Sequence, residues 1–215
     1  MVFRLSDKFI KSWEKNTDTL TSRVKEMVNQ DRTPLKSKIE SAVRSLQIQT
    51  QKLDKISYSL LERDKTLFQK IVNAQATHDT VHANIYANEL AELRKTEKTV
   101  SQSHLALEQV TLRIQTVREW GDLVASMAPV IGVISNVKKA VVRVMPEAER
   151  ELDYVGQSIS GLLMEAGEYT GGSLNLASSN EEADKIMSEA AAFAEQKMKE
   201  KFPEMPSATA SGEKT

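Results

Sequence analysis

Residues 35–74 read LKSKIESAVRSLQIQTQKLDKISYSLLERDKTLFQKIVNA, and apolar side chains return in this segment at intervals of three and four residues. A repeat near 3.5 residues places one apolar seam along a helix, where it faces a partner helix. Thr33 and Pro34 stand before the segment as an N-cap and a first helical residue. We therefore predict one long helix from about residue 35. Its seam positions are Leu35, Ile39, Ala42, Leu46, Leu53, Ile56, Leu60, Leu67 and Ala74.

The partner helix is expected directly downstream. A polar cluster at residues 76–80 interrupts the repeat, which then resumes at intervals of seven residues. Two runs of matching length on either side of a short break are typical of an antiparallel helical hairpin, here at about residues 35–125. The seam positions of the second arm are Leu93, Val100, Leu107 and Ile114, together with Val110, Val117 and Val124.

Composition predicts an all-α fold around this hairpin. The 215 residues include only 8 Gly and 5 Pro, and aromatic residues make up 5% of the chain. Such a mixture favours helices over sheets. Outside the hairpin we predict, in order, a short helix at 22–29, a break at Gly121 and Pro129, an apolar helix at about 130–145, an acidic helix from Pro146 to about Ala166, a flexible linker at 167–180, and an Ala-rich helix at 181–201.

Charge divides the chain into two opposed parts. Residues 1–146 carry 23 Lys and Arg against 16 Asp and Glu, whereas residues 147–215 carry 6 against 14. The net charges are therefore +7 and −8. A basic body joined to an acidic tail can fold back on itself and open when another anionic surface competes for the basic side. We predict a basic core at 16–146 and autoinhibitory acidic helices at 147–201.

Residues 1–15 are predicted to form a short amphipathic helix that anchors the chain to membrane. Bulky apolar side chains suit the headgroup boundary, and basic ones suit an anionic surface. One copy would bind weakly, whereas many copies on a scaffold would bind firmly. The alternative is that this helix packs on the protein itself, since short isolated helices are marginal in water. The apolar arc holds Val2, Phe3, Leu5, Phe9, Ile10 and Trp13, and the opposite face holds Arg4, Lys8, Lys11 and Lys15.

The carboxyl-terminal tail, predicted to be disordered over residues 202–215, contains one short candidate motif. Phe202, Pro203, Glu204, Met205 and Pro206 form a segment in which two prolines favour an extended backbone. Such a segment presents Phe202 and Met205 to a partner groove with little ordering cost. The alternative is a generic terminus that happens to contain proline.

Catalytic and metal chemistry find little support in the sequence. His78 and His82 lie one helical turn apart, but His104, the third histidine, belongs far along the returning arm, so solvated histidines at the hairpin tip are the simpler interpretation. The chain has no cysteine, phosphate loop or nucleophile elbow. We therefore expect neither a cofactor nor an enzyme, and the absence of cysteine fits a cytoplasmic protein.

The basic residues of the first arm have two interpretations. They form a surface for lipid or a neighbouring subunit, or they are only the solvated side of a long helix. Nucleic acid is not expected, because aromatic residues are not interleaved with them. The longest uncharged stretch, residues 123–137, is shorter than the roughly 20 residues of a membrane-spanning helix. The basic residues are Lys36, Lys38, Arg44, Lys52, Lys55, Arg63, Lys65 and Lys70.

In this order of parts the chain resembles the ESCRT-III (Snf7-like) proteins, specifically the archaeal cell-division B family, over about residues 1–205. Residues 202–206 resemble the type 2 MIT-interacting motif, with Phe where an aliphatic residue is commoner. The spacing of a type 1 motif is not evident in residues 181–201. The length is similar to that of the shorter paralogues, which lack a C-terminal winged helix.

The resemblance implies a polymer-forming subunit that binds and constricts membrane during cell division. It would assemble with itself and with paralogues, and a Vps4-type AAA ATPase would disassemble the polymer through its MIT domain. It would be cytoplasmic and peripheral on the inner face of the cell membrane at the division site. The alternatives are a coiled-coil adaptor without membrane activity and a metalloenzyme at His78 and His82.

Overall fold

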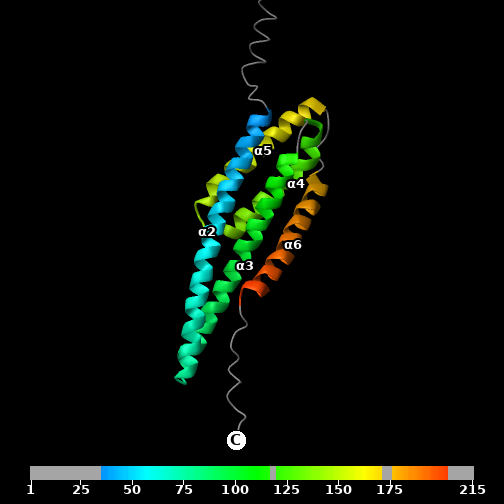
Figure 1. Ribbon diagram of the computed structural model, residues 1–215. Helices are drawn as coiled ribbons and strands as arrows, with labels where there is room; N and C mark the ends of the chain where they lie inside the picture. The colour runs from blue at the N-terminus through cyan, green and yellow to red at the C-terminus, as the bar shows by residue number, and fades with distance from the viewer. Residues whose placement is uncertain (1–34, 117–119, 171–175, 203–215) are drawn as a thin grey trace, which may run out of the picture. The chain divides into compact units, whose positions relative to one another are not determined.

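The described part of the chain is built from helices alone, which confirms the predicted all-α class. This computed structural model describes residues 35–116, 120–170 and 176–202. Residues 35–38 are the described part of one unit, Met1–Lys38, and the residues from Ile39 onward form a second (Figure 1). The helices are α2 (Leu35–Ala76), α3 (Thr80–Thr116), α4 (Trp120–Val141), α5 (Ala148–Thr170) and α6 (Leu176–Lys201).

Helices α2 and α3 form the predicted antiparallel hairpin. Three polar contacts join the arms in antiparallel register: Ser57 bonds Glu97, Asp64 pairs with Arg94, and Asp54 pairs with His104. The predicted seam residues from Ile39 to Ala74 and from Leu93 to Ile114 are buried between the helices, except Ile39 and Ile56, which are half-buried. The 3.5-residue repeat therefore predicted the interface of the two arms correctly.

The hairpin turns at His78 without a glycine. The amide of His78 donates to the Gln75 carbonyl and that of Asp79 to the Ala74 carbonyl, the two bonds of a Schellman helix end. This motif requires a left-handed residue, and His78 takes that role with φ of 58°. Asp79 then caps α3, because its Oδ1 accepts the His82 amide hydrogen at 3.0 Å.

Helix α4 differs from the prediction at both ends. The second hairpin arm ends at Thr116, and residues 120–141 form one helix that includes Gly121, Val124 and Pro129, so the predicted break is wrong. Proline inside a helix costs about 3 kcal/mol. The cost is offset because α4 buries several apolar side chains, each worth about 1.5–3 kcal/mol. These are Met127, Val130, Val133, Ile134, Val137 and Val141.

The acidic part forms two helices joined by less connecting chain than predicted. Helix α5 continues through Thr170 and α6 begins at Leu176, so helix occupies both ends of the predicted 167–180 linker. Glycine costs a helix interior only about 1 kcal/mol, so residues such as Gly167 do not end it. Helix α4 packs against α3, α5 and α6, and α6 also packs along α3 (Figure 1).

Several predictions lie outside the described residues. They are the helices at 1–15 and 22–29, the cap at Thr33 and Pro34, and residues 203–215. Within the described helices, none combines the length and apolarity needed to cross a membrane.

Candidate functional site

The acidic helices lie on the basic body, and ion pairs mark the contact. On α5, Glu151 pairs with Lys52 of α2 at 3.1 Å and also accepts a hydrogen bond from Gln49. Asp153, also on α5, pairs with Lys138 of α4 at 2.6 Å. In both ion pairs the cation comes from the basic body and the anion from the acidic tail.

Helix α6 repeats this arrangement along α3. Arg113 pairs with Glu182, and Lys98 pairs with Glu195 at 3.2 Å. Between these two pairs the Gln102 side chain donates to the backbone carbonyl of Met187 at 3.2 Å. We call these four cross-pairs and the helix faces beneath them the clasp.

Hydrogen bonds within the clasp favour the ionised forms of Lys138 and Glu195. The hydrogen bond to Asp153 raises the pKa of the Lys138 ammonium above its usual value. The hydrogen bond from Lys98 lowers the pKa of the Glu195 carboxyl, and Lys199 on the same helix acts in the same direction. Both shifts favour the charged forms, as expected for groups beside an opposite charge.

Apolar burial contributes more to the clasp than charge does. The paired side chains are between 27% and 53% exposed, and exposed ion pairs contribute only ~0.2–1 kcal/mol each. A fully buried aliphatic side chain contributes about 1.5–3 kcal/mol. The buried apolar residues of the two acidic helices include Ala148, Leu152, Val155, Ile159, Leu162, Leu163, Ala183, Ile186, Ala190 and Ala194.

Small residues let α6 approach α4 closely. A Cβ atom built on Gly132 would lie 2.8 Å from the Cβ of Ala183, which is closer than two such atoms can pack. The spacing of α4 and α6 therefore requires glycine at position 132. This contact involves no charge, so the charge pattern of the sequence gave no sign of it.

The segment predicted to bind a partner, residues 202–206, enters the described structure only through its first residue. Phe202, expected in a disordered tail, is only 8% exposed, and the Arg94 guanidinium lies 5.3 Å from its ring centroid. The prediction is therefore wrong at Phe202, because an aromatic ring beside a cation can gain more by docking than by solvation. Pro203, Glu204, Met205 and Pro206 lie outside the described residues, as do the residues at 2–15 that the sequence predicts to bind membrane.

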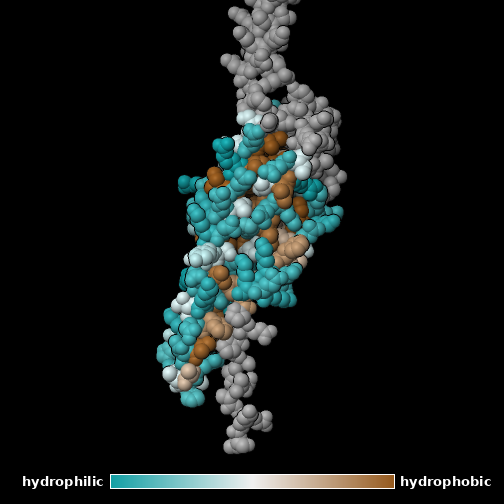
Figure 2. All heavy atoms as spheres, viewed as in Figure 1, coloured by the Kyte–Doolittle hydropathy of each residue, from teal (hydrophilic) through white to brown (hydrophobic). Residues whose placement is uncertain are grey.

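The basic residues of α2 are divided between paired and solvent-facing side chains. Lys52 belongs to the clasp, Lys65 pairs with Glu62 at 2.8 Å, and Lys70 lies 5.4 Å from the Tyr86 ring centroid. Lys55 and Arg63 are exposed. Figure 2 shows mostly hydrophilic side chains on this face, with apolar ones between them.

The histidines do not assemble a metal site in the described part of the chain. His82 Nδ1 lies 2.6 Å from Asp79 Oδ2, and the described residues contain no group of three or more His, Asp or Glu side chains placed to share a metal ion. The hydrogen bond from the His82 amide lowers the pKa of the Asp79 carboxyl. These residues cap a helix at the hairpin turn.

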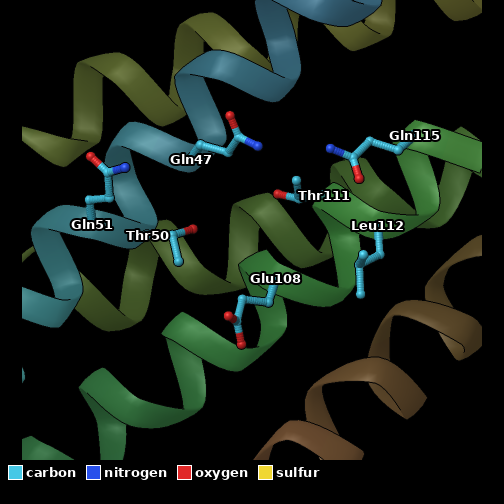
Figure 3. A pocket seen from close by; sticks show the side chains of 7 residues that line it. All are labelled: Gln47, Thr50, Gln51, Glu108, Thr111, Leu112 and Gln115. Atoms are coloured by element: carbon cyan, nitrogen blue, oxygen red, sulfur yellow. The ribbon is translucent and has the colours of Figure 1, made fainter.

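A groove of about 570 Å³ lies between α2 and α3. In Figure 3 the Gln47 and Gln115 side chains extend toward each other across it. Apart from Glu108 and Leu112, the lining consists of amides and hydroxyls, which offer hydrogen bonds but no activated nucleophile. The lining is therefore an inter-helix surface. Its residues are Gln47, Thr50, Gln51, Glu108, Thr111, Leu112 and Gln115.

Comparison with known proteins identifies the family. The chain is 40% identical over 204 residues to cell division protein B1 of Sulfolobus acidocaldarius, an alignment that covers 95% of this chain and 92% of that protein. The chain belongs to the archaeal cell division protein B family of ESCRT-III proteins.

Two further relatives agree with this ESCRT-III membership. Cell division protein B of Sulfolobus acidocaldarius is 34% identical over 161 residues, which are 75% of this chain and 62% of that protein. The ESCRT-III complex subunit did4 of Schizosaccharomyces pombe is 28% identical over 119 residues, which are 53% of this chain and 57% of that protein. No family model and no solved structure matches the chain.

Sequence reasoning missed several residues that shape this ESCRT-III chain. The charge pattern indicated that the two parts attract each other, but it named no pair. Asp64 and Glu97 occupy buried positions of the hairpin seam. A repeat of apolar residues cannot predict that carboxylates are buried there. The pairing of Asp64 with Arg94 could have been predicted from the register of the hairpin. These two residues lie almost equally far from the turn at His78, so they face each other on the two arms.

Proposed function

We propose that this chain is a polymer-forming subunit that binds and constricts membrane during cell division. It would assemble with itself and with paralogues on the inner face of the cell membrane. The fold supports a structural role, because the long hairpin offers an extended surface to neighbours. Nucleotide hydrolysis would belong to a separate Vps4-type AAA ATPase.

The clasp is the observation on which this proposal rests. Its ion pairs join lysines and arginines of the basic body to carboxylates of α5 and α6. An anionic membrane offers the same charge as these carboxylates, so it competes for the same cations. The closed chain is thus a stored form, and membrane contact favours the open one.

Residues 1–15 are the proposed membrane anchor. Their apolar arc, with Phe9 and Trp13 among its members, would insert at the headgroup boundary, and Lys8 and Lys11 would face anionic lipid. Each basic residue near such a surface contributes about 1 kcal/mol. One anchor therefore holds weakly, and a polymer of many anchors holds firmly.

Vesicle co-sedimentation of the full chain tests the anchor. Wild-type protein should pellet with vesicles that contain anionic lipid, and Phe9→Glu/Trp13→Glu should reduce the bound fraction at least tenfold. Thr19→Glu/Thr21→Glu is the matched control, because it adds the same charges outside the apolar arc. Equal pelleting of wild type and Phe9→Glu/Trp13→Glu would contradict the proposed anchor.

A further inference from the structure

The apolar seam of the hairpin is nearly the same in more than one register. Leucine recurs every seven residues along α2, and an aliphatic residue recurs every seven along α3. Sliding one arm past the other by seven residues therefore exchanges one aliphatic contact for another. The repeated residues, all of them buried, are Leu46, Leu53, Leu60 and Leu67 on α2, and Leu93, Val100, Leu107 and Ile114 on α3.

The turn of the hairpin fixes the register only weakly. When antiparallel arms slip by seven residues, the turn moves by only three or four residues along the chain, and the loop keeps its length. Residues 72–86 contain neither glycine nor proline, so none of them has a strong preference for the turn. The turn instead places His78 in the left-handed region, at φ of 58°. Neighbouring positions of the turn are therefore close competitors.

The buried charges of the seam, by contrast, fit one register only. Arg94 Nε lies 2.6 Å from Asp64 Oδ1, and a second guanidinium nitrogen lies 3.2 Å from Asp64 Oδ2. The Asp64 side chain is 3% exposed and that of Arg94 17%. Glu97, further along α3, is 2% exposed and accepts a hydrogen bond from Ser57 of α2. A buried charge that loses its partner costs far more than the exchange of one aliphatic contact for another.

A slip by seven residues in either direction separates these partners. In one direction Asp64 comes opposite Ser101 and close to Glu97, so two carboxylates meet in the seam. In the other direction Asp64 comes opposite Ala87. Both slipped registers leave Asp64 buried without the cation of Arg94, whereas the aliphatic contacts remain.

We infer that the Asp64–Arg94 pair, supported by Glu97, selects the register of the hairpin. The pair itself adds little net stability, because the desolvation of two charges offsets most of their attraction. Its effect is on the slipped registers, which it makes unfavourable. The selected register fixes which side chains of α2 and α3 lie side by side on the surface of the hairpin, and hence what any neighbouring molecule meets there.

Distances between two spin labels on the full chain measure the register. The natural chain has no cysteine, so Lys55→Cys and Asn88→Cys place one label at an exposed position of each arm. A slip of seven residues changes their separation along the hairpin by about 10 Å. Every protein in the series also carries Glu151→Ala, which removes the bonds from α5 to Lys52 and Gln49, so these bonds no longer hold α2 in place.

Asp64→Leu/Arg94→Met/Glu97→Leu makes the seam apolar. It should add a second label distance, displaced by about 10 Å from the first, because the slipped registers are no longer penalised. The midpoint of unfolding in guanidinium chloride should stay unchanged or rise. Glu62→Leu/Lys65→Met is the matched control, because it removes an ion pair of the same charges, 2.8 Å long, from the exposed side of α2. It should keep a single distance.

Moving the arginine tests the inference even if the apolar variant fails to fold. Arg94→Met/Glu97→Leu/Ser101→Arg places the cation one heptad further along α3, opposite Asp64 in a slipped register. The label separation should lengthen by about 10 Å in most molecules. A single, unshifted distance in this variant or in the apolar one overturns the inference, and so does a second distance in the matched control. A shift that follows the arginine supports it.

Discussion

The Glu97 carboxyl lies inside the hairpin with only 2% of the residue exposed. Its Oε1 accepts a hydrogen bond from Ser57 at 2.6 Å, and its Oε2 has no hydrogen-bond partner among the described residues. Burial raises the pKa of this carboxyl. The folded chain thus holds the proton to higher pH than the unfolded chain does, and stability from this group is lost as pH rises through the folded pKa.

Glu97→Gln should therefore stabilise the protein at neutral pH. A buried group without a partner costs more when it is charged than when it is neutral, so replacing the carboxylate by an amide should give a gain of about 1 kcal/mol at pH 7.5. The gain should fade below the usual pKa of glutamate, where wild-type Glu97 is protonated in both states. Thermal unfolding followed by circular dichroism from pH 4 to pH 8 measures this difference.

Glu92→Gln is the control for this series, because Glu92 is exposed on the same helix. It should leave the pH dependence of unfolding unchanged. A Glu97→Gln variant that tracks wild type across the whole range would show that burial of this carboxyl does not limit stability.

Residue-scale features were the hardest to predict from sequence. The apolar repeat makes no prediction for polar residues, so it did not reveal that Asp64 and Glu97 are buried. They are tolerated inside because Arg94 and Ser57 bond them. The polar composition of residues 76–80 predicted the turn, but it did not predict the hydrogen bonds that form the turn. Histidine in the left-handed region is uncommon, and only the hydrogen bonds of the helix end require it at position 78.

The close contact between α4 and α6 depends on the absence of a side chain at Gly132. An added Cβ on Gly132 would overlap that of Ala183, and neither atom can rotate away. Helix α6 would have to shift to make room. By contrast, an added Cβ on Gly161 of α5 has no atom within 4 Å. Replacing glycine by alanine at position 161 therefore tests helix propensity alone, whereas the same replacement at position 132 also tests the packing of α4 against α6.

Gly132→Ala should destabilise the docking of α6 by about 1–3 kcal/mol, the usual cost of an overpacked contact. Gly161→Ala should stabilise the chain by about 0.5–1 kcal/mol, because alanine is the better helix former. Amide exchange along residues 181–201 measures the docking, and thermal unfolding measures the global effect. Protection of α6 that is equal in both variants would contradict the close approach.

Elements were predicted well where a long repeat supported them and poorly at their ends. The two arms of the hairpin follow from heptad spacing over many turns. The break at Pro129 was wrong, because α4 buries enough apolar surface to outweigh the proline, and that burial depends on α3, α5 and α6. The length of the linker was overestimated for a different reason, because Gly and Ser weaken a helix only slightly.

At the scale of the whole molecule, the opposed charges of the two parts predicted that they pair, and the clasp pairs them. Charge alone did not reveal the dominant force. Four such ion pairs contribute about 1–4 kcal/mol together. The apolar faces of α5 and α6 bury several aliphatic side chains at about 1.5–3 kcal/mol each. Charge therefore selects which surfaces meet, and apolar burial holds them.

Two variants of the full chain distinguish these contributions. Glu151→Gln/Asp153→Asn/Glu182→Gln/Glu195→Gln removes the four cross-pairs and keeps side-chain size, so the chain should stay closed with a loss of about 1–4 kcal/mol. Ile159→Asn/Ile186→Asn places one amide in the apolar face of each acidic helix, at about 2–5 kcal/mol per site, and should open the clasp. Small-angle scattering reports opening as a larger radius of gyration, with loss of amide protection on α3. Equal expansion of the variant with four neutralised carboxylates and of Ile159→Asn/Ile186→Asn would contradict this expectation. It would mean that charge holds the chain closed, and high salt alone should then open the wild-type chain.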